Sequence, residues 1–180
     1  MMSDAKPVHY IRDNLAVCGF GGIGTREDFQ LHGFRAQLQC TEPFDPWLPE
    51  CVEVMATPFS DGALIPSGLF HGAQNWLAKH WDSGGKILIS CAGGQSRSVT
   101  MAAALLCLKT QLKFVDAVHE VIVRVPGAYP HPYVLASAAS LCGQPLHYEE
   151  LHRVYASVAE QPPYPWSSEL VREAVEQIYS

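Results

Sequence analysis

Several features are missing from this sequence, and each absence narrows the kind of protein that it encodes. Its 180 residues contain no run of about 18 apolar residues, the length that a membrane-spanning helix needs. The first residues, MMSDAKPVHY, have no apolar stretch typical of a secretory signal. Basic residues are few, with 12 Lys and Arg against 18 Asp and Glu and a net charge of −6. We therefore expect neither a membrane nor a nucleic acid as a partner.

Metal-binding patterns are also missing. Six cysteines are present, at positions 18, 40, 51, 91, 107 and 142. They include no C-x-x-C pair, and the eight histidines show no metal-ligand spacing. Most of these cysteines lie in apolar runs, where a free thiol behaves as a small buried side chain. We expect no metal, no cofactor, and a reducing, cytoplasmic location.

The sequence does contain enough apolar material for one packed domain, since 48% of its residues are apolar and 17% charged. Strand patterns alternate with helix patterns in the first half, and only helices follow Arg97. Strands are predicted within 8–20 (two, around an Asp-Asn turn), 34–40, 51–59 and 86–90, and helices within 25–33, 67–85, 96–111, 114–124, 131–142, 147–160 and 167–180. The segment 160–166 is the one linker-like stretch. We predict an α/β fold: a mostly parallel central sheet of about five strands flanked by helices, with a helix-rich C-terminal half.

One short segment carries the strongest chemical signal. The apolar strand ILISC ends at Cys91, a loop with Gly93 and Gly94 follows, and a helix begins near Arg97. A helix N-terminus presents unpaired N–H groups and a positive dipole end, and a tight loop leading into it adds further N–H groups. The glycines supply backbone freedom, and an arginine forms bidentate bonds with phosphate oxygens. This combination predicts a site for a phosphate-like dianion.

Cys91 gives that site a candidate nucleophile. A helix N-terminus and a nearby guanidinium both favour the thiolate form, and a thiolate facing a phosphoryl group is activated for covalent catalysis. The alternative is an ordinary core cysteine beside a glycine-rich turn. The fixed spacing of Cys91, Gly94 and Arg97 favours the nucleophile.

This spacing resembles a known signature. In this chain, Cys91 is followed by five residues and then by Arg97 and Ser98, and Gly94 is the third residue after the cysteine. This arrangement resembles the signature loop of the cysteine-dependent protein tyrosine phosphatases. AGGQSRS is most similar to the dual-specificity branch. The resemblance to that family covers residues 8–143. It includes the segment LAVCGF with the helix and strand that follow it, and the segment VRVPGAYPHPYVLASA. In the second segment, His131 stands where the family has Asn. We expect one phosphatase-like domain over 1–180, in which 144–180 adds helices.

The resemblance implies a mechanism and its residues. Cys91 attacks phosphorus and forms a phosphocysteine. The loop from Ala92 to Arg97 holds the phosphate, and that binding set is Ala92, Gly93, Gly94, Gln95, Ser96 and Arg97. Asp61, 30 residues before Cys91, is the expected general acid and base; the alternatives are a simple Asp-Gly turn or Asp45 as the acid. Ser98 is expected to help the sulfur leave, or only to start the helix. The implied substrate is a phosphorylated protein or peptide, with phosphotyrosine first and phosphoserine or phosphothreonine next.

Three alternatives stay open. The family has a histidine before the cysteine, whereas this chain has Ser90, so we expect reduced activity, and a phosphate-binding module without turnover is the competing function. The stretch 19–24 fits G-x-G-x-x-G and gives a remote dinucleotide-binding hypothesis, although the second half of such a fold is missing. Cys40 is either a trap for oxidised Cys91 or, as we favour, a buried strand cysteine.

Overall fold

A single five-stranded sheet forms the centre of the computed structural model, which describes residues 7–23, 25–42, 50–156 and 166–180. The strands lie in the order β1-β2-β5-β3-β4. Their bounds are β1 His9–Arg12, β2 Leu15–Gly19, β3 Ala36–Gln39, β4 Glu53–Ala56 and β5 Ile87–Cys91. β1 pairs antiparallel with β2, and the other pairs are parallel. The predicted α/β class and mostly parallel sheet are confirmed.

The central position of β5 explains its uniformly apolar sequence. It pairs with β2 on one side and β3 on the other, and all five of its residues are buried. Such a strand has no solvent face, so every side chain packs against protein. Cys91 is the last residue of β5 and therefore lies at the carboxyl edge of the sheet, where open α/β sheets place their ligand sites.

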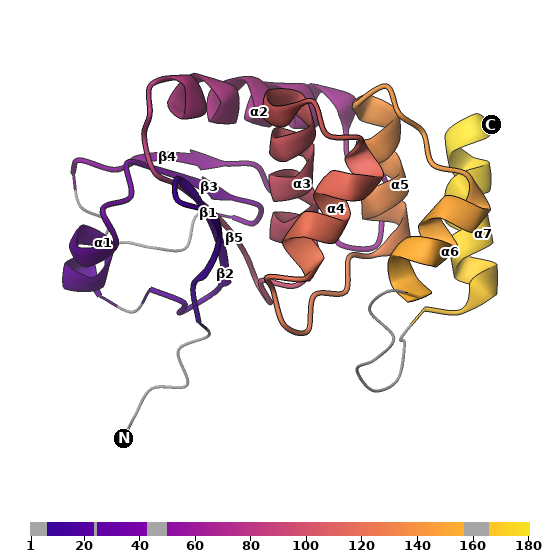
Figure 1. Cartoon of the computed structure of the whole chain (residues 1–180), viewed down its shortest axis with the longest axis horizontal. Coiled ribbons are helices and arrows are strands. Elements are labelled where there is room, and N and C mark those ends of the chain that lie inside the picture. Colours follow the sequence, from indigo (N-terminus) through magenta and orange to yellow (C-terminus); the bar gives the residue numbers. More distant parts are fainter. Residues whose placement is uncertain (1–6, 24, 43–49, 157–165) are drawn as a thin grey trace.

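The helices cover the two faces of the sheet unequally (Figure 1). Their bounds are α1 Arg26–His32, α2 Ser67–Asp82, α3 Arg97–Thr110, α4 Phe114–Ile122, α5 Pro132–Leu141, α6 Tyr148–Ala156 and α7 Ser168–Tyr179. α1 packs its Phe29 with Ala16 and Leu88 on one face. The remaining helices lie on the other face, with α6 and α7 farthest from the sheet (Figure 1). The predicted start and end of α1 are confirmed, since Thr25 Oγ1 accepts from Asp28 N and Gly33 adopts φ 71°.

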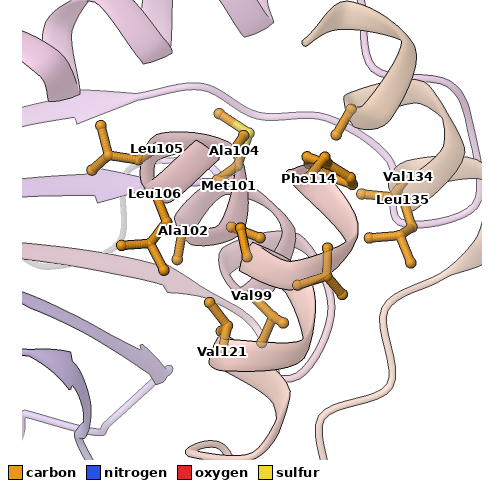
Figure 2. Close-up of a cluster of buried hydrophobic side chains, with 14 of the residues drawn as sticks. Val99, Met101, Ala102, Ala104, Leu105, Leu106, Phe114, Val121, Val134 and Leu135 are labelled. Carbon is orange, nitrogen blue, oxygen red and sulfur yellow. The ribbon is translucent and has the colours of Figure 1, made fainter. Parts of the chain in front are cut away.

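α3 is the buried central helix that its Ala- and Leu-rich sequence predicts. Every residue from Ser98 to Leu106 is buried. Figure 2 shows Val99 of α3 beside Val121 of α4, and Phe114 of α4 beside Val134 and Leu135 of α5. The small alanines let neighbouring helices approach closely, and the sheet covers the remaining side. The start of α3 is therefore held rigidly next to the end of β5.

The C-terminal helices share the same core. Leu151 and Tyr155 of α6 and Val171 of α7 belong to the cluster that contains α3. Tyr155 Oη also donates to the carbonyl of Pro130 at 2.7 Å, on the segment before α5. Most of the predicted linker 160–166 and the alternative acid Asp45 lie outside the described residues. None of the helices in the described part of the chain has the length and hydropathy of a membrane-spanning helix.

Candidate active site

The loop between β5 and α3 surrounds the sulfur of Cys91 with hydrogen-bonding groups. Cys91 is 2% exposed. The N–H of Gly94 donates to its Sγ at 3.2 Å, and Ser98 Oγ lies 3.2 Å from the same sulfur. Ser98 is fully buried in the first turn of α3, so its hydroxyl is fixed beside the thiol. Two of the predicted site residues, separated by seven positions, therefore meet at one sulfur atom.

Gly94 is the residue on which the loop geometry depends. Its φ is +72°, and a Cβ at this position would lie 2.5 Å from Gly19 N and 2.7 Å from the carbonyl carbon of Cys18. Only glycine combines this backbone conformation with so close an approach. Phe20 N donates to the carbonyl of Ala92 at 3.1 Å, so the glycine-rich end of β2 supports the loop from behind. Gly19 and Phe20, which begin the G-x-G-x-x-G stretch, thus contact this loop; Gly24 lies outside the described residues.

Arg97 is anchored by backbone carbonyls from two other segments. Its Nη1 donates to the carbonyl of Cys40 at 3.2 Å, after β3, and to that of Phe59 at 3.0 Å, after β4. Its Nε is buried and has no hydrogen-bond partner among the described residues, with Asp61 Oδ1 at 4.0 Å. A buried guanidinium N–H without a partner is costly, so this donor is suited to an anionic ligand.

Asp61 reaches the loop from the segment between β4 and α2. Ser96 Oγ donates to Asp61 Oδ1 at 2.5 Å, and the Asp61 side chain is 46% exposed. The carboxylate therefore contacts both the phosphate-binding loop and solvent. Of the predicted site residues, Asp61 therefore contacts Ser96 and lies near Arg97, and Cys91 contacts Ser98, while Ala92 and Gln95 are exposed.

Ser90 points away from Cys91. Neighbouring residues of a strand face opposite sides of the sheet, and Ser90 Oγ accepts from Gln37 Nε2 of β3 at 3.1 Å. Ser90 is 4% exposed and Gln37 2%. Sequence reasoning missed Gln37; its one available signal was a glutamine inside an apolar strand. It also missed the Cys40 and Phe59 carbonyls, because any residue type supplies a carbonyl.

Cys40 is buried, as favoured from the sequence, but it lies one residue beyond the end of its strand. It directly follows β3, and its N–H donates to the carbonyl of Ser90 at 2.8 Å, which continues the ladder with β5. Cys40 and Cys91 belong to the same buried cluster. Burial raises the pKa of Cys40 well above its ordinary value, and the charge of Cys91 raises it further while Arg97 partly opposes this. Cys40 therefore stays protonated.

His131 connects the loop to α5. Its N–H donates to Ser96 Oγ at 2.8 Å, and its Nδ1 accepts from Tyr133 N at 3.3 Å, which caps the first turn of α5. Burial lowers the pKa of His131, and the charge of Asp61 acts in the opposite direction. The neutral ring keeps the acceptor that the cap needs. In the described residues, no group of three or more His, Cys, Asp or Glu side chains is placed to bind a metal ion.

Comparisons with known proteins identify the fold. No protein-family model and no curated protein matches the sequence. The solved structure of DUSP15 matches with a TM-score of 0.65 and 18% identity over 96% of this chain and 96% of its own. A mouse putative dual specificity phosphatase complexed with zinc tungstate matches with 0.65 and 16% over 93% and 98%. The human tyrosine phosphatase-like serine/threonine/tyrosine-interacting protein matches with 0.64 and 16% over 82% and 99%.

Proposed function

We propose that this chain, which has the fold of the dual-specificity branch of the cysteine-dependent protein tyrosine phosphatases, is a phosphatase acting on phosphorylated proteins. The observation that carries the proposal is the meeting of Cys91, Ser98, Arg97 and Asp61 around one loop. The zinc tungstate complex of the mouse protein, which has a similar fold, supports oxyanion binding as a property of this chain. A mechanism that depends on a free thiol also fits the proposed cytoplasmic location.

The first chemical step forms a covalent intermediate. The Cys91 thiolate attacks phosphorus, an S–P bond forms, and the bond from phosphorus to the ester oxygen breaks. Asp61 transfers its proton to that oxygen, so an alcohol or phenol leaves instead of its anion. Arg97 and the N–H groups of residues 92–97 bind the equatorial oxygens, whose charge is spread in the transition state.

The second step returns the enzyme to its starting state. Asp61, now ionised, takes a proton from a water molecule, whose oxygen attacks phosphorus as the S–P bond breaks. The Ser98 hydroxyl, 3.2 Å from Cys91 Sγ, donates a hydrogen bond to the departing thiolate. Inorganic phosphate then leaves, and Asp61 is again protonated.

The test of this function is hydrolysis of p-nitrophenyl phosphate by the purified chain. Cys91→Ser is expected to remove turnover entirely, because the serine hydroxyl is not ionised at neutral pH. With phenyl phosphate, whose leaving group needs a proton, Asp61→Asn is expected to slow turnover by roughly 100-fold or more, the usual contribution of a general acid, while binding of inorganic phosphate is retained. Undiminished turnover by Cys91→Ser would sink the proposal.

A second candidate function is a phosphate-binding module without turnover. Ser90 favours it, since this residue stands where the family has a histidine and its hydroxyl bonds with Gln37. One matching structure belongs to a protein whose name describes it as phosphatase-like and interacting. Vanadate separates the two functions. If the chain shows no turnover but vanadate raises its melting temperature, and Arg97→Ala removes that rise, the binding module is the correct function.

A further inference from the structure

Two serines flank Arg97, and their side chains contact different reacting groups. Ser98 Oγ lies beside Cys91 Sγ, whereas Ser96 Oγ donates to Asp61 Oδ1 at 2.5 Å. Ser96 is 6% exposed. Its hydroxyl therefore links the phosphate-binding loop to the segment that carries the proposed general acid.

The direction of this link is fixed by a third segment. The backbone N–H of His131, just before α5, donates to Ser96 Oγ at 2.8 Å. A backbone N–H only donates, so Ser96 Oγ accepts there and its single proton is directed to Asp61. The result is a two-bond chain from His131 N–H through the Ser96 hydroxyl to Asp61 Oδ1.

We propose that Ser96 is a positioning residue for Asp61, an inference that rests on the proposed phosphatase function. Because Oδ1 accepts from Ser96, the transferable proton of Asp61 resides on Oδ2, which is the oxygen that must face the leaving group. Asp61 lies outside any helix or strand, and its side chain is 46% exposed. A hydrogen bond to a buried hydroxyl therefore restricts side-chain rotamers that solvent would otherwise leave free.

This role predicts that the importance of Ser96 depends on the leaving group. Phenol, with a pKa of about 10 like the tyrosine side chain, leaves only when it is protonated, whereas p-nitrophenolate leaves readily as an anion. A general acid therefore matters most for phenyl phosphate. A residue that only held the loop in shape would affect both substrates equally.

The experiment measures kcat/KM, which reports phosphoryl transfer to Cys91 and not the later hydrolysis of the phosphocysteine, for both substrates in five proteins: the native chain, Ser96→Ala, Ser96→Thr, Asp61→Asn and the double variant Ser96→Ala/Asp61→Asn. We expect Ser96→Ala to lower kcat/KM for phenyl phosphate by about 10-fold, a part of what a general acid contributes, and to lower it less for p-nitrophenyl phosphate. Ser96→Thr, which keeps the hydroxyl, should retain the leaving-group dependence of the native chain. In the Asp61→Asn background, Ser96→Ala should change kcat/KM by less than about 2-fold, because residues that act as a unit are not additive.

Three results overturn the inference. The first is that Ser96→Ala slows hydrolysis of both substrates equally. The second is that Ser96→Ala slows the Asp61→Asn variant as much as it slows the native chain. The third is that Ser96→Ala is as active as the native chain while Asp61→Asn is slow. In each of these cases the phosphatase function itself stands. If the native chain turns over neither substrate, the proposed function fails and the inference fails with it. If Ser96→Ala does not fold, Ser96→Gly, which also lacks the hydroxyl, takes the place of Ser96→Ala in these measurements.

Discussion

Gly94 is the single residue with the least freedom to change in the loop. Its φ is positive, and Gly19 N lies only 2.5 Å from the position that a Cβ would occupy, so there is no room for a methyl group. Gly93 differs, because a Cβ there would meet nothing closer than Gln95 Oε1 at 3.4 Å, the end of a flexible and exposed side chain. Two adjacent glycines thus have unequal importance, which their sequence alone does not reveal.

We predict that Gly94→Ala lowers the free energy of unfolding by about 2–5 kcal/mol, the sum of a left-handed backbone penalty and overpacking. Gly93→Ala is the matched control and should unfold within about 0.5 kcal/mol of the native chain, since it lacks both penalties. Urea unfolding followed by circular dichroism measures both. Equal stability of the two variants would contradict this account of the loop.

At the scale of secondary-structure elements, the start of α5 depends on the protonation state of its N-cap residue, His131. The His131 ring accepts the N–H of Tyr133, and Pro132 occupies the next position, which suits a helix start. Burial lowers the pKa of His131 below its ordinary value of 6.5, and Asp61 partly opposes this. The folded chain therefore favours the neutral ring, and the unfolded chain binds a proton more readily.

We predict a loss of stability below about pH 6.5, the pKa of histidine in an unfolded chain. The contribution of His131 is fully present above that value and declines as the pH falls through it, because protonation also removes the cap acceptor. His131→Asn keeps a capping side chain and does not titrate. The drop in melting temperature between about pH 7.5 and about pH 5 should be smaller in His131→Asn than in the native chain, and an equal drop would assign the pH dependence to other groups.

At the scale of the whole molecule, α6 and α7 form part of the fold's core. Leu151, Tyr155 and Val171 are 1% exposed or less and pack in the cluster that includes α3. The structural match with DUSP15 covers 96% of the chain, a share that extends into residues 147–180. We therefore propose that 1–180 is one domain, in which the C-terminal helices stabilise the segment before α5 through Tyr155 and Pro130.

We predict that a chain ending at Gly143 loses more than about 3 kcal/mol of stability, because each buried apolar side chain contributes roughly 1.5–3 kcal/mol. Leu151→Ala, a milder change in α6, should cost about 2–5 kcal/mol. The full chain should unfold in one urea transition followed by both fluorescence and circular dichroism. A truncated chain with the same midpoint would instead make 144–180 an independent appendage.

The sequence by itself determined the order of strands and helices, the parallel sheet and the loop between Cys91 and Ser98. These features depend on local patterns, such as the continuous apolar run of β5 and the glycines before a helix. Such patterns involve only residues close together in the sequence, so the sequence alone is enough to predict them. Asp61 could be predicted as the partner of that loop only through a family resemblance. Its spacing from Cys91 does not by itself specify a contact.

Only the tertiary structure decided how the loop is supported. The carbonyls that hold Arg97 come from Cys40 and Phe59, and the N–H that directs Ser96 comes from His131. Backbone groups carry no sequence signal, because every residue has a carbonyl and nearly every residue an N–H. The structure also separates Ser90 from Cys91. They are neighbours in the chain, but side chains alternate along a strand, so Ser90 faces Gln37 and Cys91 faces the loop.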